Sequence, residues 1–491
     1  MRDYILLFPI FFPMLCGFFM PLLQKKRFWE TVLFALLAIE TAVVFYIAFN
    51  VDGDMAVTVW QISGMLSISF FCDGLGRIFS CLISGIWLMA AIFSMDYMKK
   101  EEHIGRFFFF YLISLGVLLG ISYSANFMTM YLFYEFMTLM TVPLVLHSET
   151  QEAITAGLKY MGYSIFGAGL GLIGFFFLCV YGSSTEFTPG GVLDPSIIAG
   201  HENVLRIIYF EMIIGFGCKA GMYPLHAWLP TAHPVAPAPA SAVLSGLITK
   251  CGVLAIIRTT YYLFGVDFVR GTWAQTALLC LAVFTIFMGS MLAYKENLLK
   301  KRLAYSTISQ VSYVLFGVFL MTPQALSGAL LQVIGHAIAK NTLFLSSGAI
   351  INRTGKKYVS ELTGIGKSMP VVMLCFTVAS LSLVGIPPTA GFISKWYLAE
   401  GALDCSIGNI IPILGIFVLI LSALLTAGYL FTIVVKAFFP GNGFNYEALS
   451  KKEPGAVMLF PLIVLSACIL FFGMFPSGFV NFFTEIFSGI F

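Results

Sequence analysis

The stretch MYPLHAWLPTAHPVAPAP (residues 222–239) interrupts a long apolar region with five prolines. A proline inside a helix removes a backbone hydrogen bond and clashes with the preceding turn, so it breaks or kinks the helix. A second stretch, GIPPTAGFIS (residues 385–394), interrupts a later apolar region in the same way. We therefore expect two broken helices, each flanked by apolar helical sequence.

The composition around these breaks is typical of a membrane protein. Of 491 residues, 59% are hydrophobic and 10% are charged, whereas a soluble domain carries roughly a quarter charged residues. The small net charge of +3 argues against nucleic acid as a partner. The ten cysteines are scattered without a Cys-x-x-Cys pair, so we expect no iron–sulfur or zinc site and no other cofactor.

Apolar runs of about 20 residues, the length that crosses a bilayer as a helix, recur along the whole chain. They predict an all-α polytopic fold with about fourteen transmembrane helices. The predicted helices are residues 4–23, 29–50, 68–95, 107–122, 126–146, 157–182, 204–225, 239–263, 273–293, 303–321, 325–350, 370–402, 409–437 and 456–475. The first is expected to be a retained helix, because it lacks a strongly basic start. Residues 477–491 are either interfacial or a plain helix end.

The basic residues predict the topology. Every basic cluster follows an odd-numbered helix, as Lys99 and Lys100 follow helix 3 and Lys451 and Lys452 follow helix 13. Cytoplasmic loops carry the excess of lysine and arginine. We therefore expect the loops after odd-numbered helices to be cytoplasmic and both termini to lie outside.

Five sites place ionisable side chains inside the predicted helices, where a charge at the bilayer centre costs about 2.5–3.5 kcal/mol. The sites are Glu135 in helix 5, Lys219 in helix 7, Lys250 in helix 8, His336 with Lys340 in helix 11, and Lys395 in helix 12. One such residue alone is equally consistent with a structural ion pair, but five favour a proton relay. Burial favours the neutral form of a lysine and a nearby carboxylate favours its charged form, while histidine titrates near neutral pH.

The order of the helices predicts two inverted repeats, helices 4–8 and 9–13, because five crossings separate their starts. The lysine-bearing broken helices 7 and 12 then fall at the same place in each repeat, although helix 10 has Gln310 where helix 5 has Glu135. The predicted parts are residues 1–100, 101–265, 266–437 and 438–491. The glycines of residues 167–174 are interpreted as close helix packing and not as a nucleotide loop.

Four stretches carry a family resemblance. They are PLHAWLPTAHPVAPAPASAVLSG (224–246) running on to Lys250, KKRLAYSTISQ (300–310), HAIAKNTLFL (336–345) and GIPPTAGFISK (385–395). From about helix 3 to helix 13 the chain resembles the antiporter-like subunits shared by respiratory complex I, the Mrp sodium/proton antiporters and membrane-bound energy-converting hydrogenases. The resemblance implies the fourteen-helix inverted-repeat fold.

The resemblance also implies a role for each buried charge. Glu135 would pair with Lys219 and tune its proton affinity, and Lys250 would pass protons along a central axis. His336 and Lys340 would continue that axis, and Lys395 would serve the outer half-channel. The chain would work in a prokaryotic cell membrane beside sister membrane subunits, without a redox centre of its own.

Three classes of function stay open at this point. The first is a proton-translocating subunit, with or without sodium exchange, of an Mrp antiporter (as the D-type subunit), a hydrogenase or a complex I relative. The second is a stand-alone secondary transporter of a small solute, which would place more polar side chains around the breaks. The third is a haem protein, for which the six histidines are poorly placed. The sequence does not choose the coupling ion.

Overall fold

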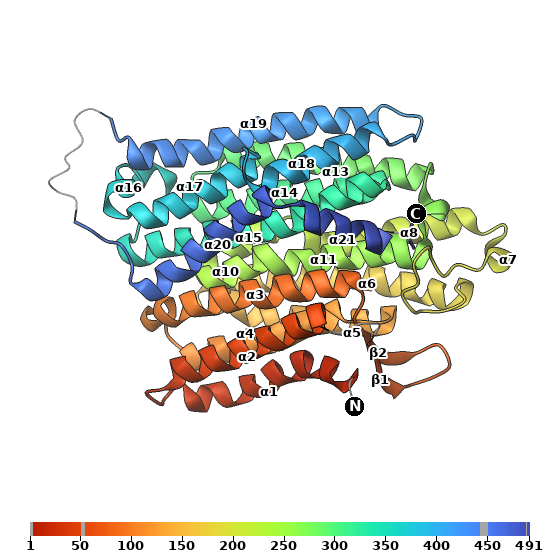
Figure 1. Cartoon of the computed structure of the whole chain (residues 1–491), viewed down its shortest axis with the longest axis horizontal. Coiled ribbons are helices and arrows are strands. Elements are labelled where there is room, and N and C mark those ends of the chain that lie inside the picture. The colour runs from red at the N-terminus through yellow and green to blue at the C-terminus, as the bar shows by residue number, and fades with distance from the viewer. Residues whose placement is uncertain (1–2, 51–54, 442–449, 488) are drawn as a thin grey trace.

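The computed structural model describes residues 3–50, 55–441, 450–487 and 489–491, and its helices run side by side along one axis (Figure 1). The described strands are β1 (Ala56–Gln61) and β2 (Ser67–Phe71), which form an antiparallel hairpin. The helical class predicted from the apolar runs is confirmed.

Eleven helices in the described ranges are long and apolar enough to cross a membrane. They are α1 (Phe8–Leu23, extended by the 3-10 turn Asp3–Leu7), α2 (Trp29–Asn50), α3 (Gly74–Tyr97), α4 (Ile104–Ser122), α5 (Phe127–Val145), α6 (Gln151–Tyr181), the α10–α11 unit (Ala238–Phe264), α13 (Trp273–Lys295), α14 (Leu299–Leu320), α19 (Ile411–Phe438) and α20 (Ala456–Met474).

The other three predicted segments form helices outside that set. They are α8 (Glu202–Ala220) with α9 (Leu229–Val235), α15 (Pro323–Thr354), and α17 (Pro370–Val384) with α18 (Ala390–Leu403). Two of the three are broken, and α15 carries polar residues in its middle. The total of fourteen membrane crossings stays a prediction. After α20 the chain forms one more short helix, α21 (Ser477–Phe487).

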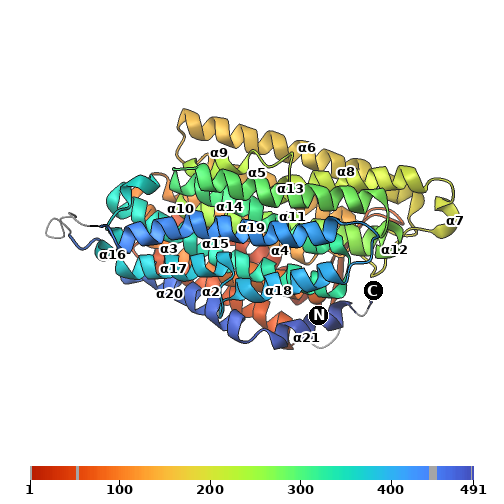
Figure 2. The ribbon, with the colours of Figure 1, turned by 90° about the horizontal axis from the view of Figure 1, so that it is seen from above.

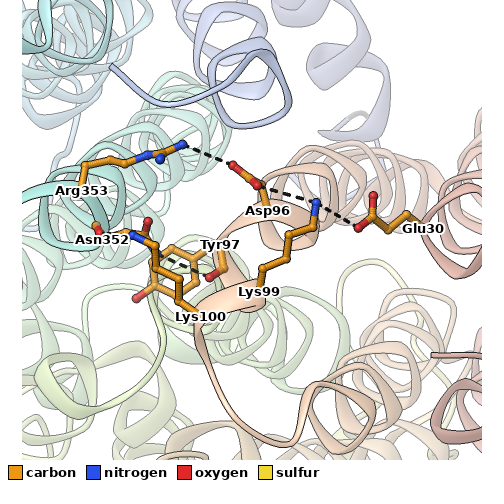
Figure 3. A network of polar contacts seen from close by, with 7 residues as sticks. All are labelled: Glu30, Asp96, Tyr97, Lys99, Lys100, Asn352 and Arg353. Carbon is orange, nitrogen blue, oxygen red and sulfur yellow. Dashed lines mark hydrogen bonds and ion pairs between the residues drawn. The ribbon is translucent and has the colours of Figure 1, made fainter. Parts of the chain in front are cut away.

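The loops that carry the basic clusters lie together at one end of the bundle. Figure 3 shows part of this end, where Lys99 at the end of α3 pairs with Glu30 of α2 at 3.1 Å. In the same network Arg353 of α15 reaches Asp96 of α3 at 3.7 Å. We call this the basic end. The β1–β2 hairpin and both chain ends lie at the opposite, hairpin end (Figure 1).

The two predicted repeats run in opposite directions. Helix α4 begins at the basic end and α13 begins at the hairpin end, so the units α4–α11 and α13–α19 are inverted relative to each other. The units meet where α10 and the π-helical turn Leu244–Ile248 pack against α15. Helix α15 is buried from Ala325 to Ile350 and runs through the middle of the protein (Figure 2).

Small residues bring α6 close to α8. A Cβ on Gly167 would lie 2.5 Å from the Gly215 carbonyl oxygen, and a Cβ on Gly174 would lie 2.0 Å from Met212 Sδ. The interpretation as close packing is confirmed for Gly167, Gly171 and Gly174, whereas Gly169 faces open space. This packing brings the side chains of α6 to the end of α8, where the first break begins.

Candidate functional site

The two broken helices share a Gly-x-x-Pro turn. Helix α8 ends before Gly221, which has φ 79°, and α17 ends before Gly385, which has φ 92°. A left-handed residue after a helix is usually glycine, because a Cβ disfavours that conformation. After each of these glycines the backbone passes a proline, Pro224 at the first break and Pro388 at the second, before it becomes helical again. Both predicted breaks are confirmed.

Lys219 lies at the last turn of α8 and is fully buried. Its Nζ donates to Tyr160 Oη of α6 at 2.7 Å and lies 4.1 Å from the centre of the Tyr160 ring. Tyr160 Oη and Thr141 Oγ1 of α5 are 2.8 Å apart. On its other side Lys219 contacts Gly252 of α11, where a Cβ would come within 2.9 Å of Lys219 Cβ. The ammonium group therefore lies at the hydroxyl groups of α6 and α5, and the backbone of Lys219 packs against α11.

Glu135 does not form the direct pair with Lys219 that the resemblance implied. Its carboxylate is half-buried and accepts from Tyr131 Oη at 3.2 Å on the same helix, while Tyr160 takes the Lys219 amine. The physical reason is the face of α5: Glu135 shares its side with the exposed Phe136, whereas the Thr141 face points inward. The two charges still interact electrostatically over a longer distance.

The two halves meet at a contact between Lys250 and His336. Lys250 Nζ lies 2.6 Å from His336 Nδ1 and donates to the Ser245 carbonyl oxygen at 2.9 Å. Ser245 belongs to the π-helical turn that precedes Lys250, and such turns are frequent at functional sites. The other ring nitrogen of His336 is buried without a partner in the described part of the chain. Both side chains are almost completely buried.

Lys340 joins this central pair through a shared acceptor. Its Nζ donates to the Leu303 carbonyl oxygen at 3.0 Å, and Thr307 Oγ1 donates to the same oxygen at 3.0 Å. Thr307 Oγ1 in turn lies 2.7 Å from Ser245 Oγ. Hydroxyl groups therefore connect Lys340 to the turn that holds Lys250.

Lys395 lies on the far side of its break. Its Nζ donates to the carbonyl oxygens of Leu383 and Val384 at 2.5 and 2.6 Å, and lies 5.3 Å from the centre of the Tyr313 ring. These carbonyls belong to the last turn of α17, where a helix leaves its acceptors unpaired. The two lysines lie close to their breaks, as predicted, but on different sides of them. Lys219 precedes its break and Lys395 follows its own.

An amide chain beside Lys395 was missed by sequence reasoning. Gln332 Nε2 donates to Gln310 Oε1 at 2.8 Å, and Ser394 Oγ donates to Gln332 Oε1 at 2.5 Å. Gln310 also lies 3.4 Å from the Leu383 carbonyl oxygen that Lys395 binds. The sequence feature that could have indicated this chain is Gln332, which lies one helical turn before His336 on the same face of α15.

Two buried polar residues lie at the proline-rich stretch: His233 belongs to it, and Lys300 of α14 binds its backbone. His233 of α9 stacks on Phe344 at 4.8 Å, and neither of its ring nitrogens has a partner among the described residues. Lys300 Nζ donates to the Ala236 carbonyl oxygen at 2.7 Å. A search of the described ranges finds no group of three or more His, Cys, Asp or Glu that could hold a metal ion.

Two family models match the chain. The transmembrane model described as NADH:quinone oxidoreductase/Mrp antiporter covers residues 124–426. The chain belongs to the NADH:quinone oxidoreductase/Mrp antiporter family. A second model, the N-terminus of complex I chain 5, covers residues 60–108. The resemblance drawn from the four sequence stretches is confirmed.

Relatives in this family include subunits of two kinds of complex. NADH-quinone oxidoreductase subunit N of Desulforudis audaxviator is 31% identical over 414 residues, which cover 82% of this chain and 80% of that subunit. Na(+)/H(+) antiporter subunit A1 of Staphylococcus aureus is 30% identical over 450 residues, which cover 86% of this chain and 54% of that subunit. The chain thus spans about half the length of that antiporter subunit.

Single chains of three solved complexes share the fold of this chain. A chain of the Mrp complex from Dietzia sp. DQ12-45-1b superposes with a TM-score of 0.87 at 21% identity, covering 100% of this chain and 98% of that one. A chain of the archaeal membrane-bound sulfane sulfur reductase gives 0.84 at 22% identity, covering 98% and 97%. A chain of respiratory complex I from Thermus thermophilus gives 0.81 at 21% identity, covering 98% of both.

Proposed function

We propose that this chain translocates protons as one membrane subunit of a larger complex, through Glu135, Lys219, Lys250, His336, Lys340 and Lys395. The observation that carries the proposal is the buried contact between Lys250 Nζ and His336 Nδ1 at 2.6 Å. Two full positive charges at that separation would repel by about 6 kcal/mol at an effective dielectric constant of about 20. The pair therefore holds one proton at a time, and a second arriving proton displaces the first.

Lys219 and Lys395, at the two breaks, bind and release the proton on either side of the Lys250–His336 pair. Lys219 reaches hydroxyl groups that can pass a proton on, and Lys395 lies where the interrupted helix exposes carbonyl groups. Glu135, on the half-exposed side of α5, tunes Lys219 by its charge when its own protonation changes. Broken helices in inverted halves are where transporters place their ion sites.

The names of the relatives support the proposal that the chain works within a complex of several subunits. One is a subunit of a quinone oxidoreductase and another of a Na(+)/H(+) antiporter, so the chain assembles with sister membrane subunits and its driving reaction comes from them. The similarity to the Na(+)/H(+) antiporter subunit supports a function in which sodium is exchanged for protons. We place the chain in a prokaryotic cell membrane with the basic end in the cytoplasm and both termini outside.

The proposal is tested with the assembled complex in proteoliposomes that contain a pH-sensitive dye. We expect Lys219→Ala and Glu135→Ala each to lower the initial rate of proton movement at least tenfold while the complex stays assembled. Lys301→Ala, which removes a surface ion pair with Glu296 at the basic end, is the matched control and keeps the wild-type rate. Wild-type movement by the Lys219 variant would overturn the relay. Repeating the assay with and without sodium identifies the coupling ion.

A further inference from the structure

A further ionisable side chain lies in the three N-terminal helices, outside residues 124–426. Glu40 stands at the middle of α2, on the buried stripe that Leu33, Leu37, Val44 and Ile47 form at helical spacing. Its side chain is 0% exposed. Glu40 therefore faces the protein interior, and its burial does not depend on a partner subunit or on lipid.

The carboxyl group of Glu40 is unpaired. Neither oxygen has a hydrogen-bond partner, and Glu40 forms no ion pair, within the part of the chain that the structure describes. Glu40 acts electrostatically on Cys16 of α1 and on Tyr123 after α4, and neither of these groups is a cation. An isolated carboxylate in apolar surroundings is so unfavourable that the group takes up a proton instead. Glu40 rests as the neutral acid.

Hydrogen bonds place Glu40 level with polar groups on the next two helices. Thr41 Oγ1 of α2 donates to the Ser84 carbonyl oxygen of α3 at 3.4 Å. Tyr111 Oη of α4 donates to the Trp87 carbonyl oxygen of α3 at 3.1 Å. Since α3 and α4 are antiparallel, three residues along each helix bring Ser114 to the level of Ser84. Ser114 Oγ is buried and also lacks a partner among the described atoms.

The same level continues on α5. Gly120 of α4 packs against Phe133 of α5, where a Cβ would lie 2.2 Å from the ring. The two helices are antiparallel, so counting six residues from each contact brings Ser114 close to the level of Thr138. Thr138 Oγ1 is buried without a partner in the described ranges. Unpaired hydroxyl groups thus lie near the level of Glu40 on α4 and on α5, the helix whose Thr141 contacts Tyr160.

We propose that Glu40 is a proton-binding carboxyl group that extends the row of translocating side chains into the N-terminal helices. This inference rests on the proposed function. In the transfer, a proton arriving at the carbonyl oxygen of the Glu40 carboxyl group binds there as the acid O–H bond breaks, so the group stays neutral. The released proton moves toward α5, where each hydroxyl group that accepts a proton gives up its own. The three helices are held for this role at the hairpin end by the ion pair of Asp73 with Arg258 at 2.5 and 2.7 Å.

The first test reads the protonation state directly and does not depend on transport. Infrared spectra of the assembled complex at neutral pH should show the carbonyl stretch of a protonated carboxylic acid, and Glu40→Gln should lose the Glu40 part of that band. Glu30→Gln, on the same helix but in a surface ion pair with Lys99, should leave the band unchanged. An unaltered band in the Glu40 variant would overturn the proposal, whatever the transport rate.

The second test reads transport in the same proteoliposomes. Glu40→Gln and Glu40→Leu should each lower the initial proton flux about threefold to tenfold, whereas Glu30→Gln keeps it. Leucine suits the apolar stripe, so an acid that is only structural would be replaced by it without loss. Wild-type flux in either Glu40 variant, beside an inactive Lys219→Ala, sinks the role of Glu40 alone. Wild-type flux in Lys219→Ala sinks the proposed function instead.

Discussion

The two breaks use the same turn but hold their lysines in different ways. At the first break Trp228 Nε1, from beyond the turn, donates to the Cys218 carbonyl oxygen at 2.8 Å, and Lys219 is left to bind a side chain, Tyr160. At the second break Lys395 comes from beyond the turn and binds the helix-end carbonyls of α17 itself. Lys219 therefore forms no hydrogen bond to a helix-end carbonyl group, whereas Lys395 caps the end of α17.

This difference separates a transport role from a structural one. A lysine held by a side chain can change partners without exposing backbone groups. A lysine that satisfies two carbonyl oxygens at a helix end takes its donors away from them when it moves. We therefore expect the two halves to respond differently when their lysines are replaced, although both belong to one row.

The largest effect is expected where the halves meet. Lys250→Ala removes the contact with His336 Nδ1 and should lower proton flux at least tenfold, as deeply as Lys219→Ala, because the row is then cut in the middle. Proteoliposome flux measures this, with Lys301→Ala as the control. If Lys250→Ala kept most of the flux, the halves would be two independent paths and not one row.

The next effect is expected in stability. Lys395→Ala leaves the Val384 carbonyl oxygen without its donor and leaves the Leu383 carbonyl oxygen only the longer bond from Gln310 at 3.4 Å. A buried unsatisfied group costs about 1–3 kcal/mol. The thermal denaturation midpoint of the purified complex should fall, together with the flux. Lys219→Ala should lose flux at a nearly unchanged midpoint, since Trp228 still binds the Cys218 carbonyl. Equal midpoints for the two variants would remove the distinction between the breaks.

A smaller loss is expected from the hydroxyl group that holds Lys219. Tyr160→Phe keeps the ring under the ammonium group but removes the 2.7 Å hydrogen bond, so flux should fall about threefold to tenfold. Tyr209→Phe removes a comparable buried bond to Thr260 at 3.1 Å and should leave flux unchanged. A larger loss in the Tyr209 variant would mean that the effect is general packing.

A mild effect is expected from a lysine outside the row. Lys159 lines a surface hollow of about 450 Å³ between α6 and the first break, where it can reach the interface at the basic end. Lys159→Ala should therefore lower the flux less than twofold in the same dye assay. A loss as deep as that of Lys219→Ala would place Lys159 in the row.

The smallest effect concerns the turns that follow α5 and α14. Each contains a non-glycine residue of positive φ, Glu149 at 54° and Met321 at 55°, but only the first turn has a histidine. Burial, with the nearby Arg106 guanidinium acting in the same direction, lowers the pKa of His147 to about 4. The unfolded chain binds this proton at about pH 6.5. The stabilising contribution of neutral His147 is therefore complete above that pH and is lost as pH falls toward 4.

His147→Gln should remove this part of the acid sensitivity. The denaturation midpoint of the complex should drop less between roughly pH 7 and roughly pH 5 than it does in the wild type. An identical drop in both proteins would show that other groups set the acid sensitivity.

Most of the architecture could be predicted from local sequence. The Gly-x-x-Pro turns break helices for steric reasons, and the basic clusters mark alternate loops, so the two breaks and the inverted units followed from residues 222–239 and 385–394. The side of the break on which each lysine lies was also readable, because Gly221 and Gly385 align.

The partners of the buried charges could not be predicted in the same way. Whether Lys219 meets Glu135 or Tyr160 depends on how α5 and α6 are rotated, which helical spacing leaves open. Glu40 differs, since the rule that selected Lys250 applies equally to a glutamate in the apolar segment 29–50. It lies outside the four stretches that carry the family resemblance, so the resemblance assigns it no role.

The most direct test of the central claim is the proton flux of Lys219→Arg in the assembled complex. Arginine stays charged under all conditions a protein meets, so it preserves a fixed positive charge at the break but cannot release a proton. If Lys219 carries protons, the flux of this variant should be as low as that of Lys219→Ala. Flux close to the wild-type rate would show that only a positive charge is needed there, and would contradict the account.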